Sequence, residues 1–170
     1  QWRVIREMLT DFYKLDEEDL YCSILPTATQ YSRNAIFSGL MPLQIKEMYP
    51  QYWIEEEEEE GKNLYEKELI QTQLDRFRKK YTFSYYKVNE SQYGKKLIET
   101  IPNMLQNDFN TIVFNFVDMM SHARTESKII RELAGNEAAY RSLTASWFLH
   151  SSTIDFFRTL AEKKVKVVIT

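Results

Sequence analysis

The apolar positions of this chain follow two different periods, and the changes between them predict the secondary structure. Short runs rich in β-branched and aromatic residues are typical of strands and occur at residues 20–25, 83–88, 111–117 and 165–170. Longer segments with apolar residues three or four positions apart are typical of helices and occur at residues 2–13, 42–48, 63–80, 91–106, 121–134 and 137–163. One more helix carries Thr29 and ends at Gly39, because glycine favours a helix C-terminus. This alternation predicts an α/β fold, a mostly parallel sheet with helices on both faces.

Composition narrows the class of protein. The chain has 170 residues, of which 44% are hydrophobic and 14% aromatic, so we expect one ordered domain with a real core. No apolar run has the length needed to cross a bilayer. The net charge of −3 offers no basic footprint for duplex nucleic acid, although a local pocket could still bind a nucleotide. The acidic run at residues 55–60 predicts a solvated loop or a frayed helix start.

The cysteine content and the two ends of the chain add two expectations. Cys22 is the single cysteine and lies in the apolar run 20–25, which predicts a buried thiol in a reducing compartment, and hence a cytoplasmic protein. The chain does not begin with Met, and its last apolar run stops without a turn or a cap. We therefore expect a piece of a longer protein.

The segment 25–39 carries the first candidate site. Thr29 brings a hydroxyl into the first turn of a helix directly after a predicted strand. A helix start offers unpaired N–H groups and the positive end of the helix dipole, which favour a bound phosphate. Arg33 follows one turn later on the same face, where its guanidinium could bind phosphate oxygens. The alternative is a capping box of Thr27 and Gln30, which would explain Thr27 but neither Thr29 nor Arg33.

A second candidate site follows the predicted strand 111–117. Asp118 stands at its carboxyl end, the edge at which open α/β sheets bind ligands, and His122 follows four residues later. A carboxylate oxygen and an imidazole nitrogen on one side are suitable ligands for zinc or a similar divalent ion. Alternatively, Asp118 caps the next helix and His122 lies on its surface. The other histidine, His150, has core-like neighbours, which favours a structural residue with its hydrogen bonds satisfied.

These motifs resemble those of the alkaline phosphatase superfamily, and most closely its PglZ-domain branch, as found in the effector part of PorX-type response regulators of Bacteroidetes. One matching block is PTAT at residues 26–29, followed by GLMP at residues 39–42, which is similar to the nucleophile helix of the nucleotide phosphodiesterase relatives. The other runs from Asp118 to His122 and is similar to their Asp-x-x-x-His zinc pair. The blocks occur in the expected order, and the resemblance covers nearly the whole chain.

The resemblance implies a zinc-dependent phosphodiesterase or phosphatase that acts on phosphoesters or nucleotides. Two zinc ions would flank Thr29, which would attack phosphorus and form a phospho-enzyme that water then cleaves. Asp118 and His122 would bind one ion, and Thr29 would lie beside the other. Arg33 remains the candidate contact for the substrate phosphate.

The chain also departs from the family pattern. It lacks the Asp expected shortly before its first residue, the Asp-His pair expected after its last strand, and a later ligand His. We therefore expect the parent protein to be the enzyme and these 170 residues alone to be inactive. The alternative is a signalling output module that binds partners or metal without turnover, with a receiver domain in the same polypeptide. A third interpretation is a structural α/β module in which Thr29 and Asp118 serve only the helix ends.

Overall fold

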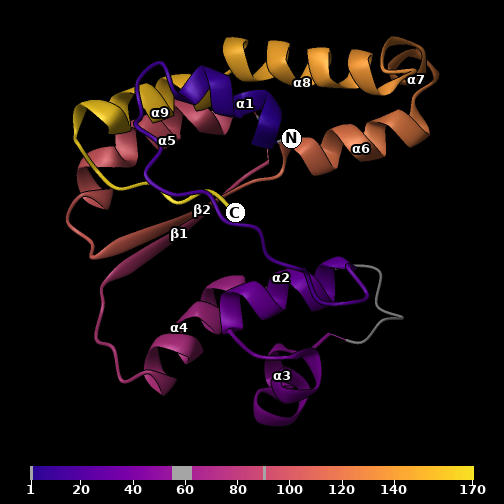
Figure 1. Ribbon diagram of the computed structural model, residues 1–170. Helices are drawn as coiled ribbons and strands as arrows, with labels where there is room; N and C mark the ends of the chain where they lie inside the picture. The colour runs from indigo at the N-terminus through magenta and orange to yellow at the C-terminus, as the bar shows by residue number, and fades with distance from the viewer. Residues whose placement is uncertain (1, 55–62, 90) are drawn as a thin grey trace. The chain divides into compact units, whose positions relative to one another are not determined.

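The computed structural model describes residues 2–54, 63–89 and 91–170, and the chain forms two compact units (Figure 1). The sheet unit comprises Gln1–Glu18 and Phe83–Thr170. The helical unit comprises Asp19–Thr82. The acidic run at residues 55–60 lies outside the described residues, so the expectation of a loop or frayed helix stays a prediction. No helix in the described parts of the chain is long and apolar enough to span a membrane.

The sheet unit is built on two parallel strands, β1 (Phe83–Val88) and β2 (Phe109–Phe114). Their register pairs the first residues, Phe83 and Phe109, whose stacked rings have centroids 5.3 Å apart. Helix α5 (Ser91–Met104) connects the strands, because parallel neighbours require a crossover rather than a tight turn. The predicted α/β class and the parallel sheet are confirmed.

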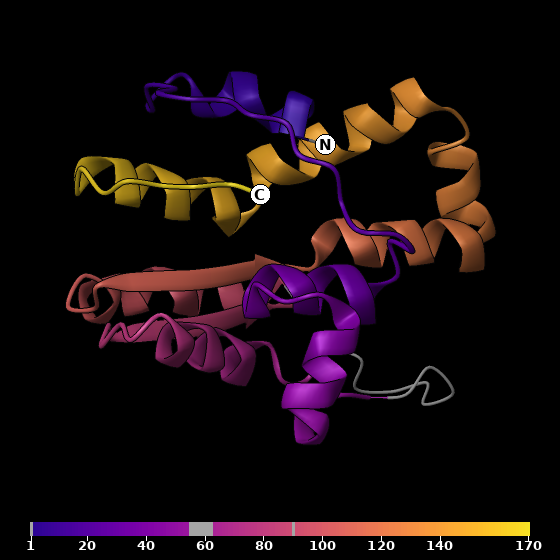
Figure 2. The ribbon, with the colours of Figure 1, turned by 60° about the horizontal axis from the view of Figure 1, so that its bottom comes forward.

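In the described residues the sheet unit has five further helices: α1 (Trp2–Leu9), α6 (Phe116–Glu126), α7 (Lys128–Leu133), α8 (Glu137–His150) and α9 (Ser152–Glu162). α9 packs against α5, and α1 packs against α8. α6 and α8 run in opposite directions on either side of α7, as Figures 1 and 2 both show. Near the start of this hairpin the rings of Phe116 and Trp147 stack with centroids 3.4 Å apart.

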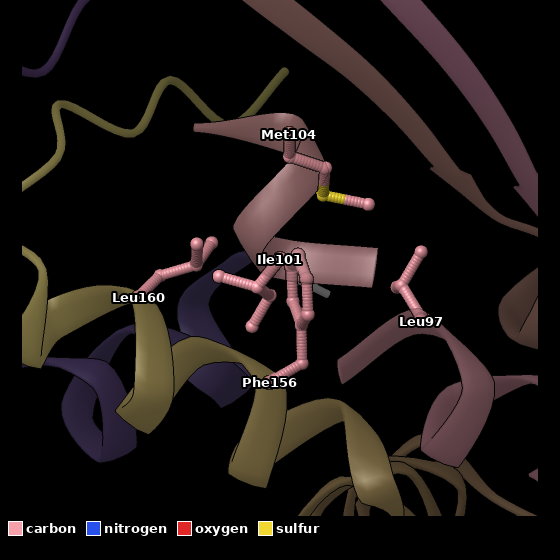
Figure 3. Packing of buried hydrophobic residues seen from close by; sticks show 5 residues of the cluster. All are labelled: Leu97, Ile101, Met104, Phe156 and Leu160. Atoms are coloured by element: carbon pink, nitrogen blue, oxygen red, sulfur yellow. The ribbon is translucent and has the colours of Figure 1, made fainter. Parts of the chain in front are cut away.

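Two apolar clusters form the core of the sheet unit. The first joins α5 to α9 and contains Leu97, Ile101, Met104, Phe156 and Leu160 (Figure 3). Alternate residues of the strands pack against it, namely Tyr86, Val88, Ile112 and Phe114. The second joins α1, α8 and α9 and contains Leu9, Phe148, Ile154 and Phe157. Phe114 contacts both clusters, so the period of two along β2 anchors the strand to the helices.

Serine residues divide the two long helices predicted in the C-terminal half. The predicted helix 121–134 begins earlier, at Phe116, and is broken at Ser127, whose Oγ accepts from the Ile130 N–H at 3.4 Å. The predicted helix 137–163 is broken at Ser151, whose Oγ accepts from the Thr153 N–H at 3.3 Å. In both places a side-chain oxygen satisfies the start of a new helix and so competes with continuation of the old one.

Two of the predicted strands are wrong. Residues 20–25 form no strand, and Leu20 and Leu25 are 98% and 86% exposed. Cys22 is likewise exposed, so the buried thiol is also wrong. Residues 165–170 form no strand either, although Val165 and Val167 pack against the core. A strand needs a hydrogen-bonded neighbour, which an apolar pattern cannot supply by itself.

β1 has its predicted bounds, whereas several other expected elements are present with shifted ends. β2 begins two residues before the predicted 111–117 and ends at Phe114, because Asn115 is the N-cap of α6, which follows at once. The predicted helix 2–13 ends at Leu9, and a turn follows.

The helical unit contains α2 (Thr29–Ser38), α3 (Pro42–Met48), the 3-10 turn η1 (Pro50–Tyr52) and α4 (Glu66–Arg76). α3 has the bounds predicted from Pro42, whereas α4 is shorter than the predicted 63–80. α2 packs against α4, as Figure 1 shows.

Gly39 ends α2 in a left-handed conformation that favours glycine. Its φ of 62° is left-handed, and its N–H donates to the Ala35 carbonyl at 2.8 Å. A Cβ at this position would lie 2.4 Å from Nε2 of Gln73 on α4. Glycine therefore suits the end of α2, and a larger residue there would require the end of the Gln73 side chain to move.

Candidate functional site

Helix α2 begins at Thr29, and the N-cap is Ala28, with φ −61° and ψ 145°. The capping box predicted for Thr27 and Gln30 is wrong, because Thr27 stands outside the helix and the Gln30 side chain is buried. Within the described residues no side-chain hydrogen bond caps this helix start. Thr29 is thus the first helical residue, in the turn whose backbone N–H groups have no partner within the helix.

Ser32 stabilises the approach to α2, and sequence reasoning alone misses it. Its hydroxyl lies 3.2 Å from the carbonyl oxygens of both Thr27 and Ala28 and can donate to either. These contacts tie the first turn of the helix to the loop before it. The available signal was its position four residues after Ala28, from which a serine hydroxyl can donate to the carbonyl of the preceding turn.

Arg33 forms an ion pair with Glu66, the first residue of α4. Nη2 of Arg33 lies 2.7 Å from Oε1 and 3.0 Å from Oε2 of Glu66. Oε1 is close enough for an ion pair, but its angle to the guanidinium does not suit a hydrogen bond. Oε2 therefore accepts the hydrogen bond from Nη2. The Glu66 side chain is 0% exposed and that of Arg33 is 22% exposed. Sequence reasoning could not find Glu66, because it is 33 residues from Arg33 and lies in no motif.

The buried face of α2 is polar. Gln30, Asn34 and Ser38 follow one another at spacings of four and are all buried. Arg76 of α4 donates to the Ser38 carbonyl and lies over the ring of Tyr49, 6.0 Å from its centroid. The helix that carries Thr29 is therefore held in place by directional contacts as well as by apolar ones.

Asp118 and His122 lie one turn apart on α6, as their spacing predicts. Oδ1 of Asp118 is 3.7 Å from Nε2 of His122, and the two side chains are 64% and 70% exposed. Two atoms each about 2.0–2.1 Å from a tetrahedral zinc ion lie about 3.3 Å apart, so a small rotation lets this pair share one ion. The alternative role of Asp118 as N-cap is wrong, because Asn115 is the N-cap of α6, whereas the surface position of His122 is confirmed.

Asn115 also links the ends of the two strands. Its Nδ2 donates to Oδ1 of Asn89 at 2.7 Å, directly after β2 and β1 respectively. Asp118 thus lies in the first turn of a helix that starts at the carboxyl edge of the sheet, where ligands bind in α/β proteins. In the described residues no group of three or more His, Cys, Asp or Glu side chains could hold a metal ion. The pair therefore supplies two ligands, and a zinc site needs more.

His150 is exposed, so the core or boundary position expected for it is wrong. Its Nδ1 lies 2.7 Å from the Ser146 carbonyl on the last turn of α8. The four predicted site residues fall into two pairs, Thr29 with Arg33 on α2 and Asp118 with His122 on α6. The pairs belong to different units, and the pocket predicted to unite them stays a prediction.

Comparison with known proteins identifies the family. The family model described as the BREX system PglZ alkaline phosphatase-like domain matches residues 1–170. No curated protein matches the chain significantly. The family match includes α2 with Thr29 and α6 with Asp118 and His122, and alkaline phosphatase-like proteins are generally metal-dependent. The chain therefore belongs to the PglZ family of alkaline phosphatase-like domains, a phosphoesterase-like family.

Proposed function

We propose that the chain supplies part of the active site of a phosphodiesterase or phosphatase, with Thr29 as the nucleophile. The observation that carries this proposal is the family match along residues 1–170. The position of Thr29 supports it, because the first turn of α2 has no side-chain cap within the described residues and helix starts of this kind bind phosphate. We expect the substrate to be a phosphoester or a nucleotide.

In the proposed reaction, the Thr29 hydroxyl gives its proton to water and its oxygen forms a bond to phosphorus, while the bond from phosphorus to the leaving oxygen breaks and the leaving oxygen takes a proton from water. A second water then forms a bond to phosphorus and breaks the bond to the Thr29 oxygen, which releases phosphate or a phosphomonoester and regenerates the hydroxyl. The backbone N–H groups at the start of α2, together with Arg33, would bind the non-bridging oxygens and stabilise the charge that develops on them.

We propose zinc as the metal, with Asp118 and His122 as two of the ligands of one ion. The chemistry of this donor pair and its separation of 3.7 Å fit zinc. When bound, a pair of zinc ions would stabilise charge on the attacking and leaving oxygens. Catalytic zinc commonly has three protein ligands, so we propose that residues outside this chain, in a longer parental polypeptide, complete the two sites.

A hydrolysis assay on an aryl phosphodiester with added zinc tests this proposal. It compares the 170-residue chain, the polypeptide of the parental open reading frame, and the Thr29→Ala variant of that polypeptide. Thr27→Ala is the matched control, because Thr27 is a neighbouring threonine outside the helix. We expect turnover only by the parental polypeptide and its Thr27→Ala variant, and a loss of at least about a thousandfold in Thr29→Ala.

Each component of the proposal can fail separately. Robust turnover by the 170-residue chain would contradict the requirement for outside ligands. Equal turnover by Thr29→Ala and the unsubstituted polypeptide would contradict the role of Thr29 as nucleophile.

The second candidate function is a signalling output module that binds metal or partners without turnover. The observation that favours it is the donor count, since Asp118 and His122 have no third ligand within the described residues. In this version the chain is the effector part of a cytoplasmic response regulator with a receiver domain. Retention of zinc by the parental polypeptide without hydrolysis of any phosphoester, together with a receiver sequence in its reading frame, would favour this function.

A further inference from the structure

Glu66 places a fully buried carboxylate at the contact between α2 and α4. Its side chain is 0% exposed, and its two oxygens lie 2.7 and 3.0 Å from Nη2 of Arg33. Arg33 follows Thr29 by one turn of α2, so the two residues share a helix face. The guanidinium proposed to bind phosphate thus has an anionic partner inside the protein.

The packing of α2 on α4 does not by itself require this ion pair. Removing two charges from water costs about as much as their attraction returns, and apolar residues of similar volume often give equal or greater stability. The helical unit already buries Ile45, Leu69 and Ile70. The ion pair instead fixes the orientation of the Arg33 guanidinium, because a carboxylate beside one Nη restrains the whole planar group.

We infer that Glu66 is a positioning residue for phosphate recognition and acts through Arg33, an inference that rests on the proposed function. Glu66 holds the guanidinium in one orientation before the phosphate arrives. Arg33 then loses little side-chain freedom on binding, whereas immobilising a free arginine would weaken the affinity by about two- to tenfold.

The test compares Glu66→Gln with Glu68→Gln in the parental polypeptide. Both residues lie in the first turn of α4, so each variant loses one carboxylate near the start of this helix. Calorimetric titration with inorganic phosphate gives the affinity, and hydrolysis of an aryl phosphodiester gives KM and kcat. We expect Glu66→Gln to weaken phosphate binding and raise KM by about two- to tenfold with a smaller change in kcat. Glu68→Gln should leave all three quantities unchanged.

The outcomes separate this inference from the function on which it rests. If the unsubstituted polypeptide binds phosphate and Glu66→Gln binds it equally well, the positioning role is overturned and the proposed function stands. If the unsubstituted polypeptide neither binds phosphate nor hydrolyses the ester, the proposed function fails, and the inference about Glu66 fails with it.

A double variant, Arg33→Leu/Glu66→Leu, covers the case in which Glu66→Gln alone unfolds the helical unit. It removes both charges together, so we expect a thermal midpoint close to that of the unsubstituted protein. Its phosphate affinity should be at least as low as that expected for Glu66→Gln. A folded double variant with unchanged phosphate affinity would overturn the role of the pair.

Discussion

The two units of the chain bury different kinds of side chain. The sheet unit buries aliphatic and aromatic residues in two clusters that share Phe114. The helical unit buries apolar residues too, but it also buries a polar row along α2 and the carboxylate of Glu66. Apolar burial is favourable in many arrangements because it has no direction, whereas buried polar groups are stable only where their partners are in place. We therefore expect the sheet unit to provide stability and the helical unit to specify orientation.

The two candidate pairs differ in the same way. Arg33 is held by a buried partner, so the fold arranges it in advance. Asp118 and His122 are exposed side chains of one helix, with Oδ1 and Nε2 3.7 Å apart. Their geometry as metal ligands depends on groups that complete the site, while that of Arg33 does not.

The largest expected effect is a loss of stability in the sheet unit. Phe156 is 1% exposed and lies between α5 and α9, so Phe156→Ala would leave a cavity in the first cluster. We expect a loss of about 3–5 kcal/mol in the free energy of unfolding, measured with denaturant. Phe77→Ala, at an exposed position, is the control and should change it by less than about 0.5 kcal/mol. Equal effects of the two substitutions would contradict the assignment of stability to this cluster.

In the helical unit, we expect removal of one member of the Arg33–Glu66 ion pair to lower the stability more than removal of both. Arg33→Ala leaves the buried Glu66 carboxylate without its cation, and we expect a loss of about 2–3 kcal/mol, below the full range because Arg33 is partly exposed. Arg33→Leu/Glu66→Leu should lie within about 1 kcal/mol of the unsubstituted protein. Thermal or chemical unfolding measures both. If the double variant were less stable than Arg33→Ala, the ion pair would be a source of stability, which would contradict the assignment of orientation to the helical unit.

The smallest expected effect is a pH dependence in the sheet unit. Burial raises the pKa of Tyr13 from 10.0 to about 12, and its hydroxyl donates to the Phe157 carbonyl at 2.7 Å. The folded state holds this proton more tightly than the unfolded state. The stabilisation is therefore complete below pH 10 and is lost as the pH rises from 10 towards 12, by about 1–2 kcal/mol after allowance for partial exposure.

Unfolding measured across this alkaline range checks the effect. Tyr13→Phe should remove this part of the pH dependence, whereas Tyr81→Phe, at an exposed tyrosine, should retain it. An identical alkaline decline in both variants would show that another group causes it.

Features that depend on local sequence were predicted well. Pro42 suits the first turn of a helix, and α3 has the predicted bounds. Residues 83–88, which were predicted to be a strand, form β1, and Gly39 ends α2 as predicted. The helix breaks at Ser127 and Ser151 were missed, because serine is also tolerated inside helices and becomes a cap only when the chain turns there.

For the candidate site, the sequence likewise predicted local features but not contacts between distant segments. The spacings placed Thr29 with Arg33 on one helix and Asp118 with His122 on another, and the family match agrees with the resemblance that these motifs indicated. Their catalytic and metal-binding roles remain predictions. Glu66 could not be found, because no local pattern identifies a partner on a helix 33 residues away.

The sequence by itself determined the α/β class, the family and the residues that carry candidate chemistry, because these depend on periodicity and on short motifs. Only the tertiary structure decided which apolar runs became strands and which carboxylate met Arg33. Strand ladders and buried ion pairs need a partner from a distant segment, and the one-dimensional pattern does not say which segments fold together.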